Sequence, residues 1–177
     1  MCNAEKNEMN KKIKKILTLL FLTFSVVSFS QNNTIEEMEW LTTETEYDGL
    51  PLYLRLPNYQ NIWEFKSKFP KLICITHEFD SVKDNGLPTA EYNESLIDFD
   101  GEVVNLFDSN KNGIIFLVET YGGARNYWFY IIDSKFFFKT FYDLKDKHSD
   151  KKLELDYRND SDWNFIKDYP VKLYESE

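Results

Sequence analysis

Cysteine and histidine are scarce in this sequence of 177 residues, which holds two of each. Zinc sites and cysteine–histidine catalysis need clusters of these side chains, so this composition disfavours both. Cys74 and His77 lie three residues apart in an expected strand and therefore point to opposite faces. We expect a buried, unreactive Cys74 and a solvated His148.

Positive charge is also in short supply, with 21 basic against 30 acidic side chains and a net charge of −9. A surface that follows nucleic-acid phosphates is therefore excluded. The sequence contains no G-x-S-x-G, P-loop, G-x-G-x-x-G or H-E-x-x-H motif. No nucleic-acid partner and no cofactor is expected.

Long hydrophobic runs are absent. The longest, residues 16–27, is broken by Thr and Ser and is shorter than the roughly 20 residues that a membrane-spanning helix needs. Four lysines at positions 11–15 precede it, and Ser28-Phe29-Ser30 follows it. This is the pattern of a secretory signal peptide over residues 1–30. Two alternatives stay open: an uncleaved N-terminal anchor, and Met9 as the true start.

Cleavage after Ser30 removes five lysines and two glutamates and changes the net charge from −9 to −12. Cys74 then remains alone, so no intramolecular disulfide can form. We expect an exported bacterial protein, periplasmic or secreted, without a membrane span after cleavage. Its expected parts are a loose linker over 31–37, one domain over 38–172 and a tail over 173–177.

Hydrophobic periodicity and turn residues predict the order of the elements. A β-hairpin turns at Asp48-Gly49, and a short helix ends before Pro70. A longer helix opens near Pro88, and another begins at Asp133 or Ser134. Expected strands cover residues 50–56, 71–79, 114–120, 126–132 and 151–157, and a terminal turn lies around Trp163.

From residue 71 to residue 157 the order is βαββαβ, which predicts an α+β fold of the ferredoxin-like, split βαβ antiparallel sandwich type. In that fold, runs 71–79 and 124–132 are central, while 113–120 and 151–157 are edges. The N-terminal hairpin and short helix precede this unit. We expect them to cover the sheet face that the two main helices leave open.

Several short segments occur in a characteristic order. Trp40 opens a strand, and a Pro precedes a central strand at Pro70. The other segments of the series, in chain order, are Asp48-Gly49-Leu50-Pro51, Gly86-Leu87-Pro88, Gly123-Ala124-Arg125 and Asp160-Ser161-Asp162-Trp163. Over residues 36–170 this order resembles the DUF695 family of bacterial domains. The resemblance implies an α+β domain and no particular reaction, cofactor or active site. Ile166 and Ser161 depart from the family's usual aromatic and Pro.

One segment matches the calcium-loop pattern D-x-[DN]-x-[DN]-G-x5-E, with Gly113 at its turn position. A calcium loop must continue into a helix, whereas residues 114–118 are β-branched and aromatic. An extended run would carry the last ligand about 20 Å beyond Gly113. We therefore interpret the match as a decoy and expect no metal at Asp108, Asn110, Asn112 and Glu119.

Arg125 follows a Gly-Gly turn and is one of only three arginines. We expect it to form a structural ion pair, with Asp160 or Asp162 as partner. The alternative is recognition of an anionic ligand by its guanidinium. Asp160 and Asp162 are expected to form a cap or Asx-turn, with paired acid–base carboxylates as the alternative. Trp163 is expected to fill the core.

These observations favour a non-catalytic extracytoplasmic binding or interaction domain, with an unknown protein or small molecule as its partner. The alternative is an unrecognised, hydrolase-like enzyme with a cleft around Arg125 and Asp160/Asp162. In either case the ligand-binding candidates are Arg125, Asp160, Asp162 and Trp163. A third possibility is a structural or homodimeric domain that uses an edge strand or the open sheet face.

Overall fold

A computed structural model describes residues 38–175; the predicted signal peptide and the linker lie outside these residues. The described chain is an α+β domain, as predicted. Its centre is one six-stranded antiparallel sheet with the strand order β1-β2-β4-β5-β3-β6. The strands are β1 (Trp40–Tyr47), β2 (Leu50–Pro57), β3 (Lys71–Glu78), β4 (Gly113–Tyr121), β5 (Ala124–Ile131) and β6 (Lys152–Asn159).

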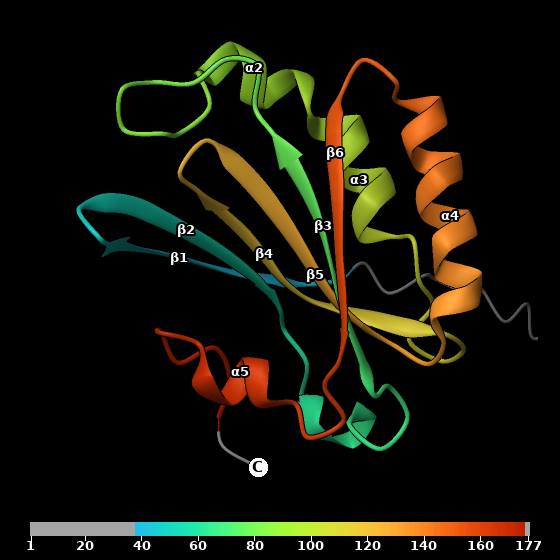
Figure 1. Cartoon of the computed structure of the whole chain (residues 1–177). Helices are drawn as coiled ribbons and strands as arrows, with labels where there is room; N and C mark the ends of the chain where they lie inside the picture. The colour runs from blue at the N-terminus through green and yellow to red at the C-terminus, as the bar shows by residue number, and fades with distance from the viewer. Residues whose placement is uncertain (1–37, 176–177) are drawn as a thin grey trace, which may run out of the picture. The chain divides into compact units, whose positions relative to one another are not determined.

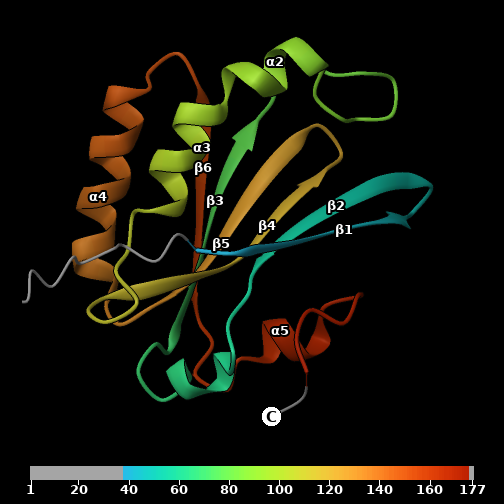
Figure 2. The same cartoon turned by 180° about the vertical axis from the view of Figure 1, so that it is seen from behind.

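Helices cover both faces of this sheet. The two longer helices, α3 (Ile97–Val104) and α4 (Ser134–Lys147), lie on one side together with α2 (Ala90–Ser95), whereas α5 (Asn164–Asp168) lies on the other (Figure 1, and from behind in Figure 2). The 3-10 helix η1 (Ile62–Phe65) joins β2 to β3. No helix within residues 38–175 has the length and hydropathy needed to cross a bilayer.

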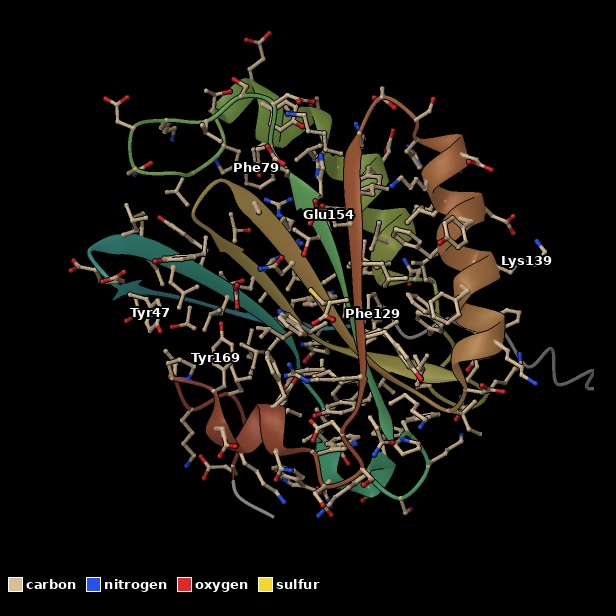
Figure 3. All side chains as sticks on the ribbon, viewed as in Figure 1. Tyr47, Phe79, Phe129, Lys139, Glu154 and Tyr169 are labelled. Carbon is tan, nitrogen blue, oxygen red and sulfur yellow. The ribbon has the colours of Figure 1, made fainter. Side chains whose placement is uncertain are left out.

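Strand alternation divides the core into two layers. In β5, Tyr127 and Phe129 pack toward α3 and α4, whereas Tyr130 packs toward Trp163 on the α5 side. Central strands that are apolar on both faces require cover on both faces, as found here. Side chains fill the space on both sides of the sheet, while Lys139 projects from the outer side of α4 (Figure 3).

We expected the N-terminal hairpin to cover a sheet face, but it does not. Its second strand, β2, pairs with β4 through Tyr53, Leu54 and Arg55, so the hairpin extends the sheet. The run 113–120 is therefore interior rather than an edge. The unpaired backbone of β4 offers hydrogen bonds that a sheet face cannot offer. The second face is covered by η1, α5 and the segment that ends at Glu175.

The long helix expected after Pro88 is two helices, α2 and α3, with Leu96 between them at φ −89° and ψ −4°. The Ser95 hydroxyl donates to the Tyr92 carbonyl oxygen at 2.7 Å, a local bond that competes with helical pairing. One apolar stripe nonetheless continues through this region, because Leu96, Phe99 and Val103 are buried. Thr89 caps α2 by accepting from the Tyr92 amide.

Candidate functional site

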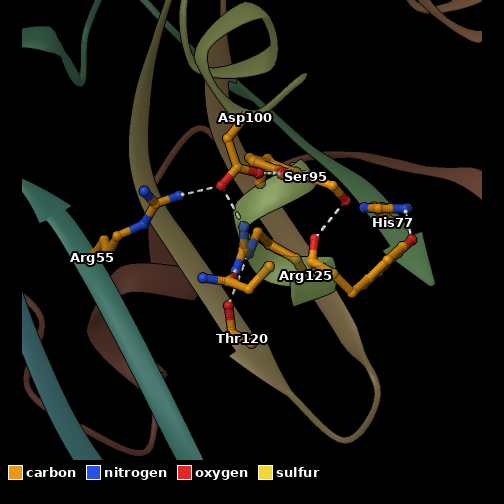
Figure 4. Close-up of polar contacts among 9 residues, drawn as sticks. Arg55, His77, Ser95, Asp100, Thr120 and Arg125 are labelled. Atoms are coloured by element: carbon orange, nitrogen blue, oxygen red, sulfur yellow. Dashed lines mark hydrogen bonds and ion pairs between the residues drawn. The ribbon is translucent and has the colours of Figure 1, made fainter. Parts of the chain in front are cut away.

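Arg125 is buried beneath α2 and α3, with 7% of its surface exposed. All three of its guanidinium nitrogens have partners (Figure 4). Nε donates to Thr120 Oγ1 at 3.0 Å, Nη2 donates to Asn93 Oδ1 at 2.7 Å, and Nη1 pairs with the Asp100 carboxylate. The guanidinium is thus engaged within the fold, as the structural interpretation of this residue expects, although its partner is Asp100.

Asp100 holds two more groups besides Arg125. The Tyr127 hydroxyl donates to its Oδ1, and Arg55 Nη2 lies 3.3 Å from its Oδ2. Burial, and then the Asp100 charge, raise the pKa of Tyr127, so that the phenol stays a donor. This carboxylate therefore ties α3 to β2 and to β5 at one point.

His77 lies beside this network and is fully buried among aromatic rings. Its Nε2 lies 3.2 Å from the Tyr92 hydroxyl, and its Nδ1 has no hydrogen-bond partner within the described chain. Burial, and to a lesser degree the charges of Lys151 and Arg125, lower the pKa of His77 to about 4. The imidazole is therefore neutral at pH 7.

Acid should weaken the fold through His77. Between pH 6.5 and pH 4 the unfolded chain binds a proton at this site that the folded chain does not, so stability falls as the pH falls. The expected loss across this window is about 3 kcal/mol. Urea denaturation at pH 7 and pH 4.5 measures it. The His77→Phe variant, which cannot titrate, should lose less stability; an equal loss in both proteins would refute the assignment.

Cys74 and His148, the other described residues that could carry cysteine or histidine chemistry, both have structural roles. Cys74 is buried on the face opposite His77, and burial raises the pKa of its thiol to about 12. The two cannot act as a nucleophile–base pair. His148 is half-buried rather than solvated, because Nε2 bonds Glu102 at 2.9 Å and the ring packs on Phe99.

Asp160 caps the segment that leads into α5, in agreement with the preferred sequence interpretation. Its Oδ1 accepts from the Asn164 amide at 2.9 Å, and its Oδ2 accepts from the Phe165 amide at 3.0 Å. The Tyr130 hydroxyl donates to Oδ2 at 2.6 Å. Both carboxylate oxygens are thus engaged in holding α5 against β5, while Asp162 is exposed nearby.

Trp163 fills the core between α5 and the sheet, as expected, and none of its surface is exposed. Its ring stacks on Tyr130 with centroids 4.2 Å apart, and Nε1 donates to the Phe69 carbonyl oxygen at 2.9 Å. Its backbone is left-handed, with φ 55°, a conformation that few non-glycine residues adopt. The indole therefore anchors a sharp turn before α5.

The structure does not bring Arg125 together with Asp160. Arg125 alternates with Tyr130 in β5, so it faces α3 while Tyr130 and its partner Asp160 face α5. A cleft that unites Arg125 with Asp160/Asp162 is therefore not formed. Sequence spacing could not reveal this, since β3 lies between β5 and β6, and this strand order is not specified by local sequence.

The calcium-loop residues are likewise separated. Asp108 pairs with Lys111 at 2.8 Å and accepts from the Asn110 amide. Glu119 lies near the far end of β4, where its partners come from other elements. Among residues 38–175 no group of three or more His, Cys, Asp or Glu side chains is arranged to hold a metal ion.

A cavity of about 390 Å³ lies between α5 and the strands β4, β5 and β6. Its walls combine aromatic rings with charges of both signs. The lining residues are Glu119, Trp128, Arg158, Asp160, Asn164, Phe165, Asp168, Tyr169 and Pro170. We call it the α5 cavity. Its volume lies within the range of small-molecule sites.

Glu119 is the most firmly oriented carboxylate of the α5 cavity apart from the cap at Asp160. Asn126 Nδ2 donates to its Oε1 at 2.8 Å, and the Tyr169 hydroxyl donates to its Oε2. Thr76 in turn donates to Asn126 Oδ1 at 2.7 Å, which fixes that amide. Sequence reasoning considered Glu119 only as a calcium ligand. The signal that could have identified Glu119 as a site residue is the pairing register of β4 and β5, in which Glu119 lies opposite Asn126.

Arg158 supplies the positive charge of the α5 cavity. Its guanidinium carbon lies 5.4 Å from the centre of the Phe165 ring. Within the described residues it makes no hydrogen bond or ion pair. The edge of the guanidinium, where all its donors lie, is therefore available to a ligand. Arg158 was not selected as a site residue from the sequence.

The model of a family of unknown function, DUF695, matches residues 39–170. The chain belongs to the DUF695 family. The resemblance seen in the sequence is thereby confirmed. Comparison with curated proteins and with solved structures gives no match. The DUF695 match includes every residue that lines the α5 cavity, from Glu119 to Pro170.

Proposed function

We propose that this DUF695 protein is exported and acts as a non-catalytic binding domain. Its ligand is a small zwitterion, with one ammonium and one carboxylate group on an apolar body, held in the α5 cavity. The observation that carries the proposal is that the cavity is lined by the carboxylates Glu119 and Asp168 and by the guanidinium of Arg158, which forms no ion pair with them within the described residues. The support for export is the sequence pattern of residues 1–30.

The ammonium group would lie at Glu119 and Asp168. Two hydrogen bonds already hold the Glu119 carboxylate in place, so little side-chain freedom is lost when a cation binds. Asp168 is exposed at the end of α5 and adds a second negative charge. The aromatic rings nearby also favour a cation.

The carboxylate group would lie at Arg158. A guanidinium presents parallel N–H donors that match the two oxygens of a carboxylate. The stacked Phe165 ring supports this side chain in one plane. The apolar part of the ligand then lies against Trp128 and Phe165, which stack on each other at 4.1 Å.

The geometry favours binding over catalysis. Asp160 uses both of its oxygens to cap α5 and to hold Tyr130. Arg125 is buried on the other face of the sheet, where Asp100 neutralises it. A hydrolase-like role for these residues would need a carboxylate and an arginine in one cleft, which they do not share. A homodimer through an edge strand remains a prediction.

Isothermal titration with phenylalanine tests this function. Phenethylamine lacks the carboxylate and 3-phenylpropanoate lacks the ammonium, so both should bind more weakly than phenylalanine. Arg158→Gln should weaken phenylalanine binding roughly tenfold, or about 1.4 kcal/mol, and leave phenethylamine unaffected. Glu119→Gln should weaken the binding of both phenylalanine and phenethylamine and leave that of 3-phenylpropanoate unaffected.

A matched control is Glu154→Gln, which removes an exposed charge from the same strand as Arg158, outside the cavity lining. This variant should bind phenylalanine like the unmodified protein. Equal affinity of all three compounds, or an equal effect of Glu154→Gln and Arg158→Gln, would contradict the proposed site.

We also propose that β3 to β6, with α3 and α4, form a ferredoxin-like unit to which the hairpin is added. The support is the strand order β4-β5-β3-β6, in which β3 and β5 are the inner strands, as the split βαβ pattern requires. Both crossing helices lie on one face of these strands (Figure 1).

A further inference from the structure

The strand β6 forms one edge of the sheet, and within the described chain it pairs only with β3. The Asp160 amide, directly after β6, donates to a carbonyl oxygen in the residue before β3. Because backbone groups alternate along a strand, the even-numbered residues of β6 turn their amides and carbonyls toward β3. Those of Leu155, Tyr157 and Asn159 therefore point outward. An edge of this kind can add a further strand.

Aromatic side chains of α4 and β6 lie exposed beside this edge. Phe138, Tyr142 and Tyr157 are 38%, 58% and 41% exposed. The rings of Phe138 and Tyr157 meet edge to face with centroids 5.7 Å apart, and Tyr142 lies one helical turn after Phe138. We call these three side chains the aromatic strip. Exposed rings beside an unpaired strand indicate a protein–protein interface.

We propose that a second copy of this chain binds here, β6 against β6, around a two-fold axis at Tyr157. Antiparallel pairing of the two strands continues the sheet from one copy to the other, and such an interface is the same patch on both. In this register Tyr157 lies opposite its own counterpart, and the two aromatic strips meet on the α4 side. On the α5 side, Asp156 of each copy lies opposite Arg158 of the other.

Charge selects this register among its neighbours. A two-fold axis at Leu155 would place Glu154 against Asp156 of the second copy. An axis at Asp156 would place two carboxylates together, and an axis at Arg158 would place two guanidinium groups together. Like charges directly opposite destabilise a sheet. Of these four positions, only Tyr157 gives opposite charges without like charges within β6, and this self-complementarity identifies a second copy as the partner.

The present contacts of the edge can be exchanged for those of the dimer. Asp156 Oδ1 accepts from the Tyr157 amide at 2.8 Å. In the dimer the Tyr157 carbonyl of the second copy accepts from this amide, which releases Asp156 to Arg158. The five N–H donors of Arg158 can serve both that carboxylate and a ligand in the α5 cavity. Lys145 donates to the Leu153 carbonyl oxygen at 3.0 Å, outside the paired residues 155–159.

Charge reversal, followed by sedimentation equilibrium over a series of concentrations, tests this dimer. The unmodified protein should be a dimer at the higher concentrations. Asp156→Arg and Arg158→Asp each place like charges opposite one another and should each weaken self-association roughly tenfold. An equimolar mixture of the two variants should form heterodimers as stable as the unmodified dimer, because the arginines of one chain then face the aspartates of the other.

Two controls match these changes. Glu46→Arg reverses an exposed charge on β1, the other free edge, and should leave the dimer unchanged. Phe138→Ala should weaken the dimer roughly fivefold. Phe136→Ala should not, because Phe136 is exposed on the opposite flank of α4. A monomeric unmodified protein, a mixture that stays monomeric, or loss of the dimer in Glu46→Arg would overturn the inference.

The dimer and the α5 cavity are tested separately. Asp156→Arg keeps every residue that lines the α5 cavity, Arg158 included, so this variant should bind phenylalanine as a monomer. Failure of the phenylalanine titration would overturn the proposed ligand and leave the sedimentation result in force. A monomeric unmodified protein that binds phenylalanine would overturn the dimer alone.

Discussion

Replacing Asp100 with alanine should destabilise the domain by about 3–5 kcal/mol. The change leaves the buried Arg125 guanidinium without its counter-charge and the Tyr127 hydroxyl without its acceptor. It also releases Arg55. Chemical denaturation followed by circular dichroism measures the free energy of unfolding. Asp98→Ala, in the same helix but exposed, should change that free energy by no more than about 0.5 kcal/mol.

A double variant separates the lost charge pair from the lost packing. Asp100→Leu/Arg125→Met replaces both buried charges with apolar side chains, and we expect it to be more stable than Asp100→Ala alone. If the double variant is the less stable protein, Arg125 has no need of a counter-charge and the description of the network is wrong. A loss below about 1 kcal/mol in Asp100→Ala would be equally contradictory.

Replacing Trp163 with alanine should cost about 3–5 kcal/mol, the range typical of a large aromatic side chain removed from a core. The variant loses the stack on Tyr130, the bond to the Phe69 carbonyl oxygen and the packing beneath α5. Denaturant titration again measures the effect.

Trp163→Phe is the informative companion. It keeps a ring over Tyr130 and loses the indole N–H, so it should cost less than Trp163→Ala, about 1–2 kcal/mol. Because α5 forms one wall of the α5 cavity, Trp163→Ala should also weaken phenylalanine binding. Equal stability of the two variants would show that the ring contributes nothing.

Much of the fold could be predicted because each element has a local signal. The Asp48-Gly49 turn, the alternating leucines of β2 and the apolar stripe through Leu96 and Phe99 depend only on neighbours in sequence. The same holds for the Asp133 cap of α4, which accepts from the Lys135 amide. These features are present where the sequence placed them.

The partners across the sheet could not be predicted, because they depend on register and strand order. Arg125 was assigned to Asp160 or Asp162, but the odd–even alternation of β5 turns it toward Asp100 in α3. Glu119 became a cavity residue only because β4 lies beside β5 and opposite Tyr169. The hairpin was placed on a face because nothing in its sequence specifies which free edge it joins.

The contact between Arg55 and Asp100 has a consequence for how the hairpin is held. Only three residue pairs join β2 to β4, so backbone pairing alone attaches the hairpin weakly. Arg55 also meets the carboxylate that Arg125 uses, so detaching the hairpin takes a second cation away from Asp100 in the network beneath α3. An appended element and the central core thus share one carboxylate, and we expect a disturbance at the hairpin edge of the sheet to reach the packing beneath α3.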